Sequence, residues 1–310
     1  MSEVNPASSA DLNGSCGTDA AMCCSQFYEQ DIVQELMGGS FHPGGEALSK
    51  QLVAGLGVDA GSSVLDIACG VGTTTRIMAH SFGLNATGLD FSEINVQKAR
   101  AAADTAPASE ASEPCCAPGD PCCSPDAGLA QLGGAEDTPS VTPGKLDFVQ
   151  GSADSLPQSD ATFDAVTCEC AVSTFADQPR AAAEFFRVLK PGGTFGMTDM
   201  VLNGELPSDF AEKAAPWTCV ARAMTVEGYQ SLFEQAGFQV VTHQDHSHTL
   251  LDLATDMKRK LVMAGMGKAL GALPALGMSI MEMRAMLSQS TELVKAGTIQ
   301  YGLLVFKKQS

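Results

Sequence analysis

Ser63-Val64-Leu65-Asp66-Ile67-Ala68-Cys69-Gly70-Val71-Gly72-Thr73 is the stretch of this 310-residue chain that decides its fold. It begins as an apolar run typical of a buried strand, and its two glycines precede an expected helix over Thr74 to His80. Glycines suit this turn because they leave backbone N–H groups open to a ligand and tolerate a positive φ. The third glycine of a dinucleotide fingerprint is absent. The stretch therefore predicts a nucleotide-binding turn without a pyrophosphate ligand, and an ordinary strand-to-helix turn is the alternative.

The rest of the chain repeats the alternation of strand and helix. Further strands are expected at Asn85 to Asp90, Lys145 to Gln150, Phe163 to Cys168, Thr194 to Met200, Phe238 to Thr242 and Thr298 to Phe306. Helices are expected over 226–236 and over 178–190, where Pro191-Gly192-Gly193 ends the helix. This alternation is typical of a doubly wound α/β sheet.

A carboxylate closes each of the first two strands. Asp66 lies near the end of the first, Asp90 ends the second, and Ser92 is placed to cap the next helix. An acidic residue at the tip of the second strand can accept hydrogen bonds from both hydroxyls of a ribose. The alternative is that Asp66 and Asp90 are helix N-caps.

Five segments, in this order, resemble the S-adenosylmethionine-dependent methyltransferases of the Rossmann-like class I. They are Val64-Leu65-Asp66-x-x-Cys69-Gly70-x-Gly72, Gly88-Leu89-Asp90, Gly151-x-Ala153-x-x-Leu156-Pro157, Phe163-Asp164-x-Val166 and Arg187-Val188-Leu189-Lys190-Pro191-Gly192-Gly193. The resemblance covers roughly residues 52–200. It implies S-adenosylmethionine as the cofactor and a mostly parallel, seven-stranded sheet with an antiparallel last strand and a helical insertion before it.

The resemblance also assigns cofactor-binding residues. It implies that Asp66, Gly70 and Gly72 hold the methionine part of the cofactor and that Asp90 binds its ribose. Where the family commonly has an acidic residue reading the adenine amino group, this chain has Ser152, so that contact is expected from Asp154. The other predicted cofactor-binding residues are Cys69, Phe91, Ala153 and Cys168. Cys69 is also interpreted as a small packing residue.

Composition limits the partners. A net charge of −18 argues against nucleic acid and anionic membranes, which attract clustered lysine and arginine. The longest apolar tract, Leu261 to Met283, is broken by charges, a proline and four glycines, so no membrane span is expected. Eleven cysteines without an export signal indicate reduced thiols in the cytoplasm. A small-molecule or metalloid substrate is expected and a thiol reductant is a candidate partner; the oligomeric state stays open.

Three regions are expected along the chain: a flexible tail over 1–24, the cofactor-binding domain over 25–200, and an acceptor-binding segment with Met-rich helices and a final strand over 201–310. A low-complexity, disordered insertion over 101–144 interrupts the domain. Tyr28 and His42 are candidate lid residues, with surface helix and loop positions as the alternative.

Paired cysteines stand in the tail and in the insertion. They are Cys23-Cys24, with Cys16 nearby, then Cys115-Cys116 and Cys122-Cys123. Soft thiolates suit a thiophilic metal or metalloid, although the spacing does not fit a structural zinc site. Sequence drift is the alternative.

The acceptor is expected near Glu169 and Cys170, just past the fourth strand, because ligands collect at the carboxyl ends of such strands. Further on, Ala215 to Ala223 resembles the acceptor segment of arsenite methyltransferases, in which a tryptophan, here Trp217, stands shortly before a cysteine. That resemblance maps Cys170 and Cys219 onto the family's two metalloid-binding thiolates and makes them the predicted catalytic pair. Small residues in a half-buried pocket are the alternative.

Other acceptors imply other residues. Trivalent arsenic offers a lone pair and no proton, whereas an oxygen or nitrogen acceptor usually needs a general base. The candidate bases are Glu169, His243, His246 and His248, the histidines being otherwise solvated loop residues. The Met-rich stretches after Leu250 are expected to line an apolar, quinone-like acceptor pocket, with adaptable core or an oligomer contact as the alternative. A third hypothesis is a thiol-rich metalloid-binding protein without activity.

Overall fold

The computed structural model describes residues 42–104, 141–214, 219–264 and 279–309. Tyr28, Trp217 and the cysteines of the tail and insertion lie outside the described residues. The helix before the insertion continues through Asp104, so the first residues of the predicted 101–144 segment are helical.

Seven strands form one sheet in the order β3-β2-β1-β4-β5-β7-β6. The strands are β1 (Ser63–Ile67), β2 (Asn85–Asp90), β3 (Leu146–Gln150), β4 (Phe163–Glu169), β5 (Leu189–Leu202), β6 (Phe238–Asp245) and β7 (Ile299–Lys308). The pairs among β1 to β5 are parallel, and β7 runs antiparallel to both of its neighbours. The predicted doubly wound sheet with an antiparallel last strand is confirmed.

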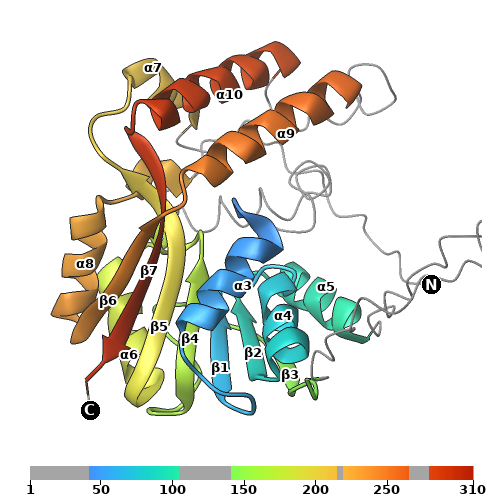
Figure 1. The fold of residues 1–310 in the computed structure, drawn as a ribbon, viewed down its shortest axis with the longest axis vertical. Helices are drawn as coiled ribbons and strands as arrows, with labels where there is room; N and C mark the ends of the chain where they lie inside the picture. The colour runs from blue at the N-terminus through green and yellow to red at the C-terminus, as the bar shows by residue number, and fades with distance from the viewer. Residues whose placement is uncertain (1–41, 105–140, 215–218, 265–278, 310) are drawn as a thin grey trace, which may run out of the picture.

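Helices cover both faces of the sheet (Figure 1). One face carries α3 (Gly45–Gly55), α4 (Thr73–Phe82) and α5 (Glu93–Asp104), and the other carries α6 (Gln178–Val188) and α8 (Val226–Gln235). Between the sheet and α6 with α8 lies an aromatic core of Phe185, Phe195, Phe233, Phe238 and Phe306. This packing fixes the carboxyl ends of the strands, where the site lies.

Three more helices lie beyond the carboxyl ends of the parallel strands: α7 (Ser208–Ala214), α9 (His248–Ala264) and α10 (Ile280–Lys295) (Figure 1). Helices α9 and α10 pack against each other and against β7, and they form the predicted helical insertion before the last strand. Within the described ranges, no helix is both long enough and apolar enough to cross a membrane.

The fifth strand begins earlier than predicted. Helix α6 ends at Val188, and β5 starts at Leu189 and runs through Pro191-Gly192-Gly193. Phe163 pairs with Leu189 but Ala165 pairs with Thr194, so the extra residues form an irregularity in the ladder. A proline and two glycines are tolerated there because the ladder is interrupted at that point.

The glycine turn after β1 leaves no room for a side chain at Gly72. This residue has φ +76°, and a Cβ built on it would lie 2.5 Å from Cε1 of Phe148. We expect Gly72→Ala to lower the free energy of unfolding by about 2–4 kcal/mol, from backbone strain plus overpacking. Gly57→Ala, at φ +65° with open space around it, is the control and should lose only the strain, about 1–2 kcal/mol. Equal urea midpoints for the two variants would contradict the role of Phe148.

Candidate active site

A pocket lies along the carboxyl ends of β3, β2, β1 and β4, where the sequence placed the cofactor. Nine of the predicted site residues line it: Asp66, Cys69, Gly70, Asp90, Phe91, Ser152, Ala153, Asp154 and Cys170. Glu169 and His42 line it as well. Parallel strands bring these residues together from positions more than a hundred residues apart in the chain.

Asp66 is buried in the floor of the pocket and fully hydrogen-bonded. Oδ2 accepts from the Thr75 hydroxyl at 2.7 Å, and Oδ1 accepts from the Thr167 hydroxyl at 3.0 Å. Burial, with a smaller contribution from the nearby Glu169 carboxylate, raises the pKa of Asp66 to about 7. The residue is therefore poised between its two protonation states near neutral pH.

This pKa has a consequence for stability. Because it lies above the value of 3.8 in an unfolded chain, the folded state binds more protons between about pH 4 and pH 7, and stability falls as pH rises through that window. Asp66→Asn should remove this dependence and stabilise the ligand-free protein at pH 8 by up to about 4 kcal/mol, while leaving it nearly unchanged at pH 4. Urea titrations at the two pH values test this; a variant less stable at pH 8 than the parent would contradict it.

Asp90 holds the glycine turn in place. Its Oδ2 accepts from the backbone N–H of Gly70 at 2.8 Å, and its Oδ1 accepts from the N–H of Ser92 at 2.9 Å. The hydroxyl of Ser92 in turn accepts from the N–H of Asn95, as the predicted cap of α5. Asp90 therefore stabilises the turn, whether or not it also contacts a ligand.

Ser152 and Asp154 act together at the other end of the pocket. The Ser152 hydroxyl donates to Oδ1 of Asp154 at 2.6 Å. Both residues line the pocket after β3. A hydrogen-bonded pair therefore stands where the sequence led us to expect Asp154 in place of an acidic residue at 152.

Three predicted site residues do not line this pocket. Gly72 caps α4 and packs against Phe148, so it shapes the turn without facing the pocket. Cys168 is fully buried in the core beneath the strand end, and burial raises the pKa of its thiol well above the usual value. The side chain of Cys168 points to the opposite side of β4 from its neighbours because side chains alternate along a strand. Cys219 is not among the lining residues, and its thiol contacts that of Cys170, which is among them.

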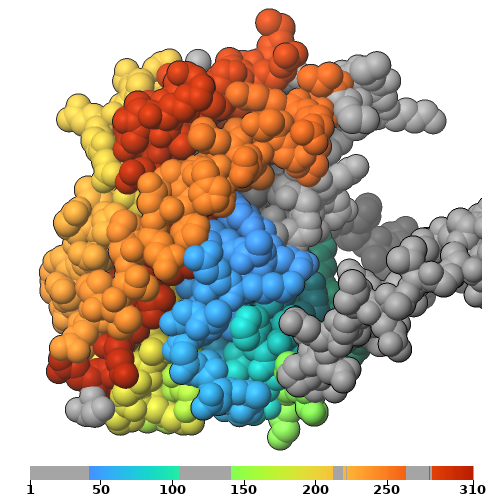
Figure 2. Space-filling model, viewed as in Figure 1, coloured from blue at the N-terminus to red at the C-terminus, as the bar shows by residue number. Residues whose placement is uncertain are grey.

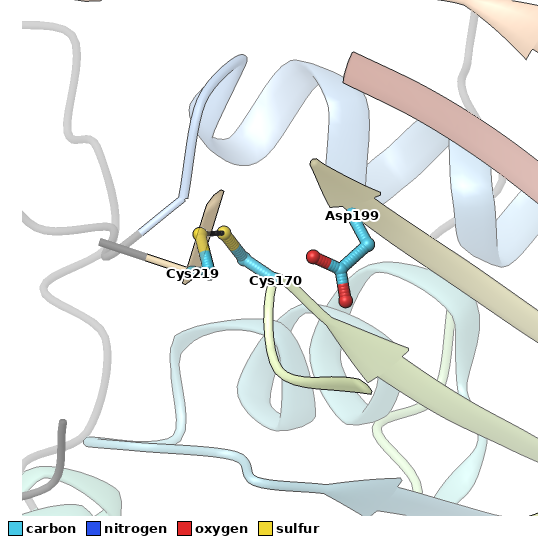
Figure 3. Close-up of side chains that lie close together, drawn as sticks. All are labelled: Cys170, Asp199 and Cys219. Atoms are coloured by element: carbon cyan, nitrogen blue, oxygen red, sulfur yellow. Dashed lines mark hydrogen bonds between the residues drawn. The ribbon is translucent and has the colours of Figure 1, made fainter. Parts of the chain in front are cut away.

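The two predicted acceptor cysteines lie side by side. The Sγ atoms of Cys170 and Cys219 are 3.4 Å apart, and Figure 3 shows the two thiols pointing toward each other. Two short turns that contact each other, η2 (Val172–Thr174) and η3 (Cys219–Arg222), bring them together. The separation is too long for a disulfide bond of about 2.05 Å. It is short enough for both sulfurs to bind one atom.

Cys170 has an uncommon backbone conformation, with φ +53°. Its N–H donates to the carbonyl of Thr198 at 2.7 Å, which fixes the residue at the end of β4. A non-glycine residue in this region stores strain and persists only where its surroundings hold it. The chain therefore turns sharply at the position that carries the thiol.

Asp199 is a site residue that the sequence reasoning missed. One of its carboxylate oxygens lies within 4.8 Å of both thiol sulfurs (Figure 3). Its oxygens accept from the N–H and hydroxyl of Ser173 and from the N–H of Met200. Burial raises the pKa of Asp199 to about 6. With these donors it anchors the turn that follows Cys170, and its place near the carboxyl end of β5 was the signal that could have identified it.

Glu169 joins three elements at the pocket wall. Its Oε1 accepts from the hydroxyl of Thr74 at 2.7 Å and of Ser49 at 3.0 Å, and its Oε2 lies 3.6 Å from Nδ1 of His42. Ser49 belongs to α3 and Thr74 to α4. Glu169 lines the pocket, and the network around it was not predicted.

The other candidate bases lie elsewhere. His246 and His248 line a separate groove between α3 and α9, where the orange surface of α9 borders the blue surface of α3 in Figure 2. His243 stands on β6, away from the strand ends that form the pocket. His42 lines both the groove and the pocket. Of the proposed bases, only Glu169 is in the pocket.

The methionines of the Met-rich stretches after Leu250 differ in burial. Met283 is buried, Met286 packs against the apolar cluster that borders both acceptor cysteines, and Met281 is 82 % exposed. Met266 and Met278 lie outside the described residues. An apolar wall, formed by Met200, Phe210, Val220 and Tyr301 with Met286, thus stands beside Cys170 and Cys219.

Comparisons with known proteins agree on the type of enzyme and differ on the acceptor. Residues 46–243 match the family described as a methyltransferase domain. An arsenite methyltransferase of Halobacterium salinarum is 31% identical over 97 residues, which cover 31% of this chain and 25% of that protein. A ubiquinone/menaquinone biosynthesis C-methyltransferase of Marinomonas is 29% identical over 163 residues, covering 53% of this chain and 51% of that protein.

The fold is shared with solved structures. The cyclopropane synthase MmaA2 of Mycobacterium tuberculosis superposes with a TM-score of 0.69 over 94% of this chain and 98% of that chain, at 15% identity. At this identity the likeness concerns the fold alone.

Proposed function

Because this chain belongs to the methyltransferase-domain family, it is a methyltransferase that uses S-adenosylmethionine, and we propose that its acceptor is arsenite or a related metalloid bound by Cys170 and Cys219. The observation that carries the proposal is the 3.4 Å separation of the two sulfurs at the end of the cofactor pocket. Trivalent arsenic is a soft centre, and two converging thiolates are the ligands that such a centre prefers.

The pocket suits the cofactor. Asp66, Asp90, Asp154 and Glu169 line it, and none of the described residues lining it is a lysine or an arginine. S-adenosylmethionine carries a sulfonium and an ammonium group, so a carboxylate-lined pocket favours it. We assign the ribose to Asp90, the adenine to the Ser152–Asp154 pair, and the methionine part to the turn at Gly70 and to Asp66.

The chemistry needs little from the protein beyond positioning. The arsenic lone pair attacks the methyl carbon, and the carbon–sulfur electron pair leaves with the cofactor sulfur. Arsenic is formally oxidised in this step, so a thiol reductant returns it to the trivalent state. Thiols must stay reduced for this, in agreement with the expected cytoplasmic location. Holding the two reactants in line can supply roughly 7–11 kcal/mol of the barrier.

One observation favours a second candidate. The apolar wall beside the thiols could equally take an organic ring, and the Marinomonas relative is named for quinone biosynthesis. In that case the acceptor would be carbon, oxygen or nitrogen, with Glu169 as the base.

One assay separates the two candidate acceptors. Reduced protein is incubated with methyl-labelled donor and, in separate reactions, with arsenite, a quinol and amine acceptors, and the label is followed into each product. We expect label on arsenic. Label on the organic acceptors only would favour the second candidate. Donor binding without transfer to any of these acceptors would contradict both candidates.

A further inference from the structure

We propose that Glu169 is the counter-ion of the cofactor's sulfonium and makes this protein bind S-adenosylmethionine more tightly than S-adenosylhomocysteine. The inference rests on the Oε2 atom of Glu169. It is buried, and among the described residues it has no hydrogen-bond donor. The side chain is 5 % exposed and lines the cofactor pocket.

The other acidic groups of the pocket already have local partners. Both oxygens of Asp66 accept from threonine hydroxyls, and both oxygens of Asp90 accept from backbone N–H groups. Oδ1 of Asp154 accepts from Ser152. A buried carboxylate oxygen without a donor is costly, and the cost is offset when a cation comes close to it. Glu169 is therefore the carboxylate of this pocket best placed to gain from a bound cation.

The neighbours of Glu169 hold the side chain in place and leave Oε2 without a hydrogen-bond donor among the described residues. Ser49 and Thr74, both buried, donate to Oε1. Nδ1 of His42 lies 3.6 Å from Oε2, and its Nε2 lies 3.2 Å from the Ser49 hydroxyl. The imidazole is the single basic side chain among the described residues that line the pocket. Its 3.6 Å distance from Oε2 is longer than a hydrogen bond.

The position along the pocket identifies which cation is involved. Asp90 ends β2 and Asp154 follows β3, at the end assigned to the adenosine, whereas Glu169 ends β4 on the other side of β1. Glu169 also directly precedes Cys170, which the proposed function makes part of the acceptor site, so the inference that the reacting sulfonium lies here rests on that proposal. The sulfonium is positive before transfer, and the product thioether is neutral. A fixed carboxylate therefore favours the substrate form of the cofactor and weakens the hold on the product.

Calorimetry of cofactor binding, with no acceptor present, tests the proposed role of Glu169. Its outcome does not depend on whether arsenite is the substrate. The wild-type protein should bind S-adenosylmethionine about tenfold more tightly than S-adenosylhomocysteine. Glu169→Gln should weaken binding of S-adenosylmethionine and of sinefungin, which carries an amine in place of the methylated sulfur, by about tenfold, and leave S-adenosylhomocysteine within about twofold. Glu46→Gln is the matched control, since Glu46 is exposed on α3 and pairs with Lys50. It should change none of the three affinities.

Two results would overturn the inference. One is an equal loss for all three ligands in Glu169→Gln, which would assign Glu169 to the shared ammonium or to a structural role. The other is equal affinity of the wild-type protein for S-adenosylmethionine and S-adenosylhomocysteine, a measurement that stands even if the variant does not fold.

Discussion

Replacing Cys170 or Cys219 by serine is expected to abolish arsenite methylation while leaving the affinity for S-adenosylmethionine within about twofold. A serine hydroxyl is a hard ligand that stays protonated at neutral pH, so either change removes one of the two arms that orient the arsenic. Because orientation supplies up to roughly 7–11 kcal/mol, we expect the rate to fall by at least about a thousandfold. Arsenic speciation by mass spectrometry, with calorimetry of donor binding, measures both quantities.

The paired cysteines of the low-complexity insertion provide the control for this experiment. Changing Cys115 and Cys116 to serine should lower the rate at scarce arsenite but not the maximal rate, since on the proposed assignment these thiols deliver arsenite and Cys170 and Cys219 orient it for attack. Full arsenite turnover by the Cys170→Ser, Cys219→Ser double variant would refute the acceptor assignment. Glu169 would then be examined as the base for an organic acceptor.

Loss of the Asp90 carboxylate is expected to lower donor affinity by roughly one to two decades. On the proposed assignment of Asp90 to the ribose, the variant loses charge-assisted hydrogen bonds to the ligand, about 1.5–3 kcal/mol. Asp90 also binds the N–H groups of Gly70 and Ser92, so Asp90→Ala should in addition loosen the turn. Asp90→Asn keeps one acceptor oxygen, so its donor affinity should lie between those of the parent protein and Asp90→Ala. Calorimetry with S-adenosylhomocysteine measures the affinities, and circular dichroism checks the fold.

Asp104→Ala, at the exposed end of α5, is the matched control for Asp90→Ala and should bind the donor like the parent. Unchanged affinity in a folded Asp90→Ala protein would remove Asp90 from the cofactor site.

The fold followed from local pattern where the pattern was strong. Strand β2 begins and ends at the residues predicted, because an apolar run leads to Asp90 and a capping serine follows it. The start of β5 was missed because Pro191-Gly192-Gly193 ordinarily ends an element. Pairing with β4 across an irregular ladder overrides that local preference.

The site was predicted only where single positions carry a signal. Asp66, Asp90 and Gly70 stand in a motif, and the pairing of Cys170 with Cys219 followed from a resemblance. The contacts of Glu169 and Asp199 could not be predicted. Glu169 meets Ser49 across 120 positions of the chain and Asp199 meets Ser173 across 26, and neither contact leaves a pattern in the local sequence.

Arsenic X-ray absorption on the protein with one equivalent of arsenite tests the acceptor assignment most directly. To isolate the site, serine replaces the seven cysteines of the tail and the insertion, which are Cys16, Cys23, Cys24, Cys115, Cys116, Cys122 and Cys123. We predict an arsenic atom bound by two sulfurs, and loss of both when Cys170→Ser and Cys219→Ser are added. Arsenic bound by oxygen alone, or a sulfur signal that survives these two substitutions, would contradict the assignment.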